Sequence, residues 1–184
     1  MLFRLVLLFT VVACQGRSPS PPVPRPVIEA KDSHGTVTAR VTPGHPCRAN
    51  VDGLEMLVGG RPLVAMNGSA RWTGEDAADG TTLRKNDEVV ARIHANQLFD
   101  HQGMSLVHLM PDGTIQDFEG KVSRRANIAP NRITIGDLEV TGTHDAALAV
   151  MLTAPEATPE VRALAACHYL LVDRTDEPNE PKRR

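Results

Sequence analysis

Short runs of alternating side chains, separated by turn-forming pairs, fill the middle of this 184-residue chain and constrain its fold more than any other feature. Residues 35–41 (GTVTARV) place their apolar side chains on one face, as in a half-buried strand. Four later pairs suit two-residue β-hairpins because they tolerate positive φ. They are Gly59-Gly60, Asn86-Asp87, Asp112-Gly113 and Gly136-Asp137. The pattern over residues 27–142 therefore predicts an antiparallel meander, a sandwich or partly open barrel of about eight strands.

The turn pairs recur at similar intervals, which leaves two explanations for this β domain. One is a duplicated hairpin unit that repeats a binding face, since residues 79–92 weakly echo residues 112–124. The other is an ordinary meander, in which turns recur without duplication. Few identities join the two segments, so the ordinary meander is favoured.

The periodicity changes after Gly142, where a first helix is expected. Residues 143–152 (THDAALAVML) are rich in helix formers. Thr143 is the expected N-cap, with the negative charge of Asp145 in the first turn. Pro155 ends this helix.

A second helix is expected from Thr158, because Thr158-Pro159-Glu160 combines an N-cap, a proline at the first helical position and an acidic side chain. Apolar side chains from Val161 to Val172 form one stripe, with His168 in its middle. A strand over residues 166–172 is the alternative. The expected fold class is α+β, mostly β, with a helical hairpin over residues 143–173 packed on the β domain.

The N-terminal residues predict export and a lipid anchor. Residues 1–13 (MLFRLVLLFTVVA) have one early positive charge and an apolar run too short to cross a bilayer as a helix, as in a signal peptide. Val11-Val12-Ala13-Cys14 resembles the lipobox of bacterial lipoproteins. The resemblance implies cleavage before Cys14 and acylation of that cysteine, with palmitate among the expected fatty acids. It also implies sorting to the outer membrane, because Gln15 is not aspartate.

Residues 14–26 are expected to form the lipidated Cys14 and a Pro-rich linker. The segment 15–26 (QGRSPSPPVPRP) contains prolines at five positions, which is typical of a semi-rigid polyproline spacer. Its twelve residues would reach about 37 Å at roughly 3.1 Å per residue, enough to hold a domain clear of lipid head groups. Residues 174–184 (RTDEPNEPKRR) are expected to form a disordered tail.

Three cysteines are present, and lipid on Cys14 would leave Cys47 and Cys167 in an oxidising compartment. An even remainder there favours a disulfide. It would pin the C-terminal helices to the β domain, and the alternative is two free thiols. No Cys-x-x-Cys redox motif occurs.

Composition limits the possible functions. A formal net charge of −2 and only 3% aromatic residues argue against nucleic-acid binding, which needs a basic face and stacking aromatics. Trp72 is expected in the core rather than exposed for recognition. Seven histidines are present, but no zinc-ligand spacing or catalytic motif contains them. No catalytic residue, metal or cofactor is assigned, and His168 is expected to be a buried structural histidine.

The sequence favours a lipid-anchored, non-enzymatic protein of the cell outer membrane. It would contact the membrane through Cys14 and bind another envelope protein or a cell-wall component. Two alternatives remain. One is a periplasmic hydrolase or lipoprotein toxin with a site built from histidines such as His94, His101 or His144, and the other is a carrier of small apolar ligands inside a β-barrel.

Overall fold

The computed structural model describes residues 26–60 and 62–172. The predicted signal peptide, Cys14, the linker up to residue 25 and the predicted tail at residues 174–184 lie outside these described residues.

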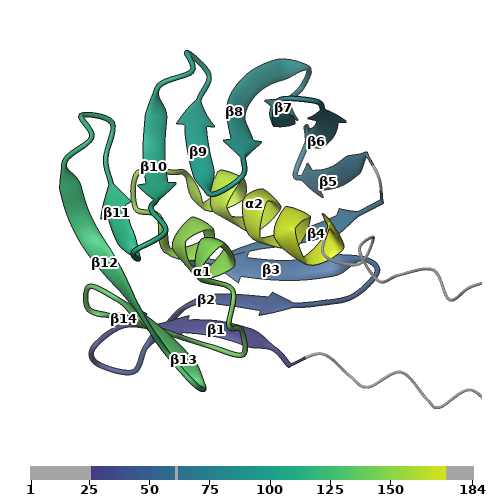
Figure 1. The fold of residues 1–184 in the computed structure, drawn as a ribbon. Coiled ribbons are helices and arrows are strands. Elements are labelled where there is room, and N and C mark those ends of the chain that lie inside the picture. Colours follow the sequence, from purple (N-terminus) through teal and green to yellow (C-terminus); the bar gives the residue numbers. More distant parts are fainter. Residues whose placement is uncertain (1–25, 61, 173–184) are drawn as a thin grey trace, which may run out of the picture.

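The described chain forms fourteen antiparallel strands followed by two helices (Figure 1). The elements are β1 (Ile28–Lys31), β2 (Val37–Thr42), β3 (Cys47–Val51), β4 (Leu54–Gly59), β5 (Leu63–Asn67), β6 (Ala70–Ala77), β7 (Gly80–Lys85), β8 (Glu88–His94), β9 (Gln97–Asp100), β10 (Ser105–Leu109), β11 (Thr114–Gln116), β12 (Val122–Ala129), β13 (Arg132–Ile135), β14 (Leu138–Thr141), α1 (Ala146–Thr153) and α2 (Pro159–Val172).

Each strand pairs with its neighbours in sequence, and β1 pairs with β14, so the sheet closes into one barrel. The mostly β, antiparallel fold with two C-terminal helices confirms the expected class. The barrel is closed rather than partly open, and the number of strands exceeds the expected eight. The reason is that most strands have only four to six residues and additional turns divide the runs. The alternation buried–exposed–buried along β3 shows how each strand turns one face inward.

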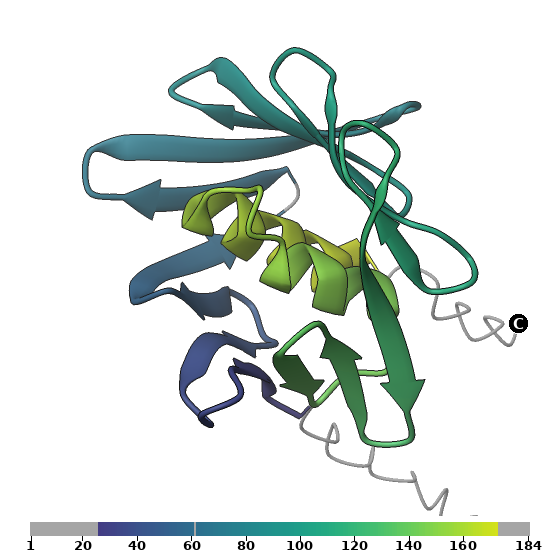
Figure 2. The ribbon, with the colours of Figure 1, turned by 90° about the vertical axis from the view of Figure 1, so that its left-hand side faces the viewer.

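The helical hairpin lies within the barrel, with strands on all sides of it (Figure 2). Every side chain from Ala147 to Thr153 in α1 is buried, as is every side chain from Val161 to Cys167 in α2. The described apolar residues of the predicted stripe are buried, and burial extends beyond them to the other faces of α2, at Arg162, Ala163, Ala166 and Cys167, as expected for a helix inside a core. The strand alternative for residues 166–172 is wrong.

The cap of α1 differs from the prediction by two residues. Asp145 is the N-cap, and its carboxylate accepts hydrogen bonds from the backbone N–H groups of Ala147 (2.8 Å) and Leu148 (3.2 Å). Thr143 instead accepts a hydrogen bond from the N–H of Asp145. The carboxylate is the stronger cap here because it satisfies two orphan donors and places negative charge at the positive end of the helix.

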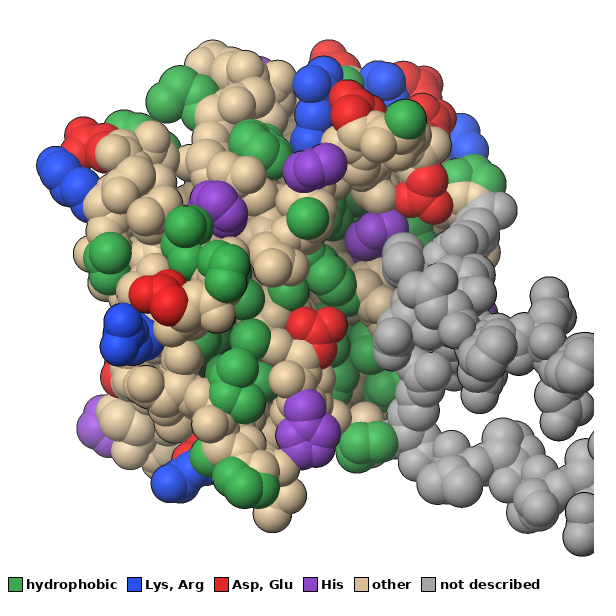
Figure 3. Space-filling view, in the orientation of Figure 1, with side chains coloured by type: hydrophobic (Ala, Val, Ile, Leu, Met, Phe, Trp, Pro, Cys, Tyr) green, Lys and Arg blue, Asp and Glu red, His purple; other side chains and the backbone are tan. Residues whose placement is uncertain are grey.

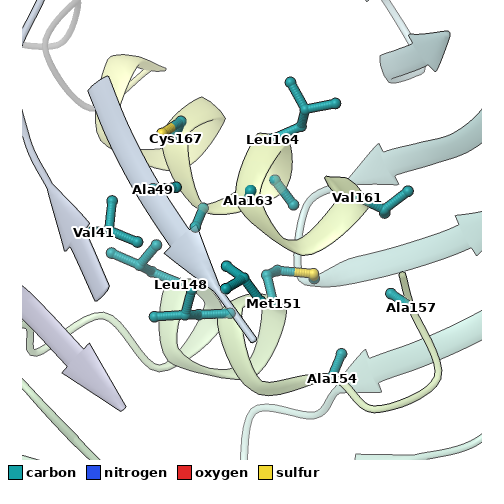
Figure 4. Close-up of a cluster of buried hydrophobic side chains, with 14 of the residues drawn as sticks. Val41, Ala49, Leu148, Met151, Ala154, Ala157, Val161, Ala163, Leu164 and Cys167 are labelled. Atoms are coloured by element: carbon teal, nitrogen blue, oxygen red, sulfur yellow. The ribbon is translucent and has the colours of Figure 1, made fainter. Parts of the chain in front are cut away.

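The core is built from aliphatic side chains of both helices and of the inner barrel wall. Figure 4 shows Leu148, Met151 and Leu164 of the helices in one cluster with Val41 of β2 and Ala49 of β3. Many helix positions at this contact are alanine, which lets the helices approach each other and the sheet closely. Trp72 is 3% exposed, so its assignment to the core is confirmed.

Three links between side chains hold the helices in the barrel. A disulfide joins Cys47 of β3 to Cys167 of α2, with 5.9 Å between the two Cα atoms, which confirms the predicted bridge. The buried Arg162 of α2 donates to the carbonyl of Leu152 (2.8 Å) and to Asp52 (2.6 Å) in the β3–β4 turn. Two further side chains, Arg124 of β12 and Glu156 of the α1–α2 connection, form an ion pair at 2.8 Å.

The predicted hairpin turns are confirmed in part. Asn86 and Asp87 connect β7 to β8 with φ of 48° and 71°, as a primed turn requires. Gly136-Asp137 also forms a two-residue connection, with φ of 61° at the glycine. Gly59 instead ends β4 and Gly60 begins a three-residue connection, while Asp112-Gly113 lies in a four-residue connection; these two connections contain Pro62 and Pro111.

The meander gives the barrel two distinct ends. We call the end with the seven odd-to-even connections, such as β1–β2 and β3–β4, the turn end. The opposite end is the chain end, because β1 begins there and β14 finishes beside it, with Glu29 paired to Thr141. Helix α2 also finishes at the chain end, since Tyr169 donates a hydrogen bond to the carbonyl of Ala95 in the β8–β9 connection.

Candidate functional site

A polar cluster at the chain end contains His168, which stood out in the sequence. The hydroxyl of Thr81 on β7 lies 3.1 Å from Nε2 of His168 on α2. The same hydroxyl donates to the carboxylate of Asp76 on β6 at 2.7 Å, and His168 Nδ1 lies 4.0 Å from that carboxylate. Asp76 and Thr81 are brought together because they are directly paired across the β6–β7 hairpin.

The direction of these hydrogen bonds determines what the cluster can do. In a nucleophilic triad the hydroxyl donates to the imidazole, and the imidazole donates to the carboxylate. Here the proton of Thr81 points to Asp76, so Nε2–H of His168 must donate to the Thr81 oxygen. This order differs from that of a nucleophilic triad, in which the imidazole accepts the hydroxyl proton. The contact instead connects the last turns of α2 to the β6–β7 hairpin.

Two neighbouring side chains extend this cluster along the chain end. His94 of β8 donates through Nδ1 to the carbonyl of Asp79 at 2.8 Å. Burial raises the pKa of the Tyr169 hydroxyl, and the negative charge of Asp145 raises it further. Tyr169 therefore remains a neutral donor to Ala95 at physiological pH, and its ring contacts that of His168 edge to face, with centroids 6.0 Å apart.

The remaining histidines do not converge. His94, His101 and His108 are seven residues apart in sequence, and the fold separates them. His94 lies at the chain end of β8, His101 in the β9–β10 connection at the turn end, and His108 within β10. His144 lies exposed between β14 and α1. Figure 3 shows the histidine side chains of one face spread over it, with Lys and Arg at the periphery. Within residues 26–60 and 62–172, no group of three or more His, Cys, Asp or Glu side chains is arranged to hold a metal ion.

The turn end carries a recurring braced turn that the sequence analysis missed. Asp32, Asp100 and Asp117 each begin a five-residue segment D-x-x-G-x that leads from one strand to the next, and Asp100 is itself the last residue of β9. Each carboxylate accepts hydrogen bonds of 2.8–3.0 Å from two backbone N–H groups of its own turn. The N–H of Thr36 is the main reason that the pKa of Asp32 lies below its usual value. The signal was present as aspartate three residues before glycine, which a search for two-residue turns overlooks.

The two ends differ in charge. The seven connections of the turn end contain six acidic side chains and one basic side chain, Lys121. The acidic residues are Asp32, Asp52, Asp87, Asp117, Glu119 and Asp137. The connections between strands at the chain end contain the acids Asp79 and Asp112, and they include five prolines in the sequence. The turn end is therefore the more acidic of the two.

Two further findings complete the description of the chain. None of the helices in the part that the structure describes combines the length and the apolar character needed to cross a membrane. No known protein family, curated protein or solved structure matches this chain.

Proposed function

We propose that this chain is a lipid-anchored bacterial envelope protein, acylated on Cys14, that acts as a non-enzymatic binding or accessory component at the outer membrane. The observation that carries the proposal is the arrangement of the two barrel ends. The chain enters β1 and leaves α2 at the same end, so an anchor attached through the N-terminal linker would keep this end toward the membrane. The seven connections of the turn end would then face away from it.

Charge supports this orientation. Anionic head groups repel carboxylates, and the effect decays within about 8–10 Å at physiological ionic strength. The turn end carries six acidic side chains against one basic side chain. Whenever the linker bends and the barrel comes within this distance of the lipid, directing the turn end away avoids the repulsion and exposes the acidic connections to a partner in the envelope.

The two alternatives find less support in the described residues. A hydrolase needs an activated nucleophile or a metal-bound water, and the hydroxyl of Thr81 donates to the carboxylate of Asp76 and not to the imidazole of His168, unlike the hydroxyl of a nucleophilic triad. A carrier in a β-barrel needs an internal cavity, but the helices α1 and α2 occupy the interior of this barrel. A binding role requires neither feature.

The first experiment tests the anchor. Cys14→Ala should move the protein from the membrane fraction to the soluble fraction, and Ser18→Ala in the same N-terminal segment should not. Retention of the Cys14→Ala protein in washed membranes would overturn the anchor.

The second experiment tests the orientation and the partner. A photo-crosslinking side chain at Glu119 of the turn end should couple to another envelope component in intact cells, and the same side chain at Asp112 of the chain end should not. Both positions are well exposed, which makes them a matched pair. Equal crosslinking at the two positions would contradict an oriented binding surface.

A further inference from the structure

Two of the contacts between neighbouring strands are shorter than all the others. The β4–β5 contact and the β10–β11 contact are each paired at two positions, whereas every other neighbouring pair is joined at three to six positions. We call these two contacts the seams of the barrel. They divide its wall into a lid of six strands, β5–β10, and a base of eight strands, β11–β14 with β1–β4. The paired residues are Val58 with Ala65 and Gly59 with Val64 in the first seam, and His108 with Gln116 and Leu109 with Ile115 in the second.

Both seams lie at the chain end, beside the β4–β5 and β10–β11 connections. Toward the turn end, the described residues of the two strands in each seam are not paired with each other. A hollow of about 460 Å³ lies between the strands of the first seam, lined by Glu55, Leu57, Val64, Ala65 and Met66. In Figure 2 the teal strands of the lid lie on one side of the helices, and the purple and blue strands of the base lie on the other. Backbone pairing therefore joins the lid to the base at the chain end alone.

The side-chain links follow the same division. The disulfide, the buried arginine of α2 and the ion pair of the α1–α2 connection all join the helices to strands or turns of the base. The lid contacts α2 through Thr81 and Asp76 with His168, and through Ala95 with Tyr169, and all of these residues lie at the chain end. The other side-chain hydrogen bonds and ion pairs formed by the described residues of the lid stay within the lid.

Apolar packing holds the turn-end half of the lid against the helices, and one polar group opposes this closure. Trp72 belongs to the core and lies on the inner wall of the lid. The exposed Lys85, at the turn end of β7, places its ammonium 5.3 Å from the centre of the Trp72 ring. The indole Nε1–H of Trp72 is buried and finds no acceptor among the described residues. A buried donor without an acceptor costs free energy, which contact with water restores.

We infer that β5–β10 is a hinged lid, which pivots at the two seams and opens at the turn end. Opening uncovers the inner wall around Trp72 and the helix faces packed against it. The helices stay with the base, because the Cys47–Cys167 disulfide joins them covalently. The closed form predominates, since opening exposes apolar side chains to water. The lid opens at the end that the proposed function directs toward a partner, but the hinge itself does not depend on an anchor at Cys14.

Thiol labelling of buried positions tests the lid in the purified full-length protein with its disulfide intact. Ala91→Cys places a thiol on the inner wall of the lid, and Ala39→Cys places one on the inner wall of the base. The two alanines are 0% and 1% exposed, which makes them a matched pair. Reaction with N-ethylmaleimide, followed by peptide mass spectrometry, reports how often each wall is exposed. The proposal expects residue 91 to react at least about tenfold faster than residue 39. Equal rates would mean that both walls are exposed together, by unfolding of the whole domain, and would overturn the lid.

The indole proton of Trp72 supplies a second measurement without any substitution, because the chain contains one tryptophan. Opening of the lid exposes this proton to deuterated water, whereas the backbone amides of β7 stay bonded to β6 and β8 inside the lid. In exchange experiments followed by NMR, the proposal expects a protection factor at least about tenfold lower for the indole proton than for the β7 amides. Equal protection would show that the lid unfolds instead of pivoting, which refutes the hinge. Neither measurement involves Cys14, so failure of the anchor and failure of the lid are separate results.

Discussion

Removing the Cys47–Cys167 disulfide should cost more stability than any other single link between helices and barrel. The bridge closes a loop of 120 positions in the unfolded chain. In the chain-entropy description this loop raises the free energy of unfolding by about 5 kcal/mol at 25 °C. For a chain of this size about 5 kcal/mol corresponds to a fall of roughly 10–20 °C in Tm.

The assay is urea unfolding of the wild-type protein with and without a thiol reductant, followed by the fluorescence of Trp72 and by far-UV circular dichroism. The wild-type chain is preferable to a cysteine variant because it keeps the native side-chain volume. The matched control is the double variant Arg124→Gln with Glu156→Gln, which removes an ion pair between β12 and the α1–α2 connection. Loss of that partly exposed pair should cost at most about 1 kcal/mol.

A reductant effect below about 1 kcal/mol would refute the entropic argument. It would mean that the strands already hold residues 47 and 167 close together in the unfolded ensemble, or that the packing of α2 alone determines stability. An effect equal to that of the ion-pair control would point to the same conclusion. An effect of several kcal/mol would make the disulfide a condition for a stable plugged barrel.

Three further outcomes are expected. Arg162→Met should lower the free energy of unfolding by about 1–3 kcal/mol, because the buried carbonyl of Leu152 loses its hydrogen-bond donor. In a urea titration, Arg162→Lys should recover part of the lost stability. Thr81→Val and His168→Gln should each destabilise, and a double-mutant cycle should give a coupling energy of at least about 0.5 kcal/mol; additive effects would contradict the hydrogen bond between them. The lowered pKa of Asp32 favours its ionised form in the folded state, so this contribution is complete above the unfolded pKa and is lost as pH falls through the folded value. The stability difference between wild type and Asp32→Asn should therefore shrink below about pH 4 in thermal melts, and a difference independent of pH would contradict the argument.

Local sequence determined much of the fold. The positive φ values at Asn86 and Asp87 follow from residue type, and so does the start of α2 at Pro159. The disulfide could be predicted by counting cysteines, because two would remain in an oxidising compartment once Cys14 carries lipid. These features depend on few residues and need no knowledge of distant contacts.

Barrel closure could not be obtained in this way. It depends on the pairing of β1 with β14, which joins Glu29 to Thr141 across 112 positions. The uniform burial of Ala147–Thr153 depends in turn on that closure, because a helix outside a sheet would expose one face.

The polar cluster at the chain end was missed for a related reason. His168 could be identified as unusual because it interrupts an apolar stripe, but its partners lie on a hairpin some ninety positions away, with Thr81 separated by 87. Asp76 and Thr81 meet across strands, and no spacing rule for catalytic or metal sites contains them. Only the three-dimensional arrangement shows that the hydroxyl donates to the carboxylate.

The plug at the centre of the barrel is made from the last residues of the fold to be synthesised. A chain exported from its N-terminus would bring fourteen strands through the membrane before α1 and α2 could emerge. Until then the inward face of every strand would lack its packing partner, and Cys47 would have no Cys167 to pair with. The disulfide between Cys47 and Cys167 can form only when α2 has entered the barrel, so an oxidised pair reports a domain whose plug is in place.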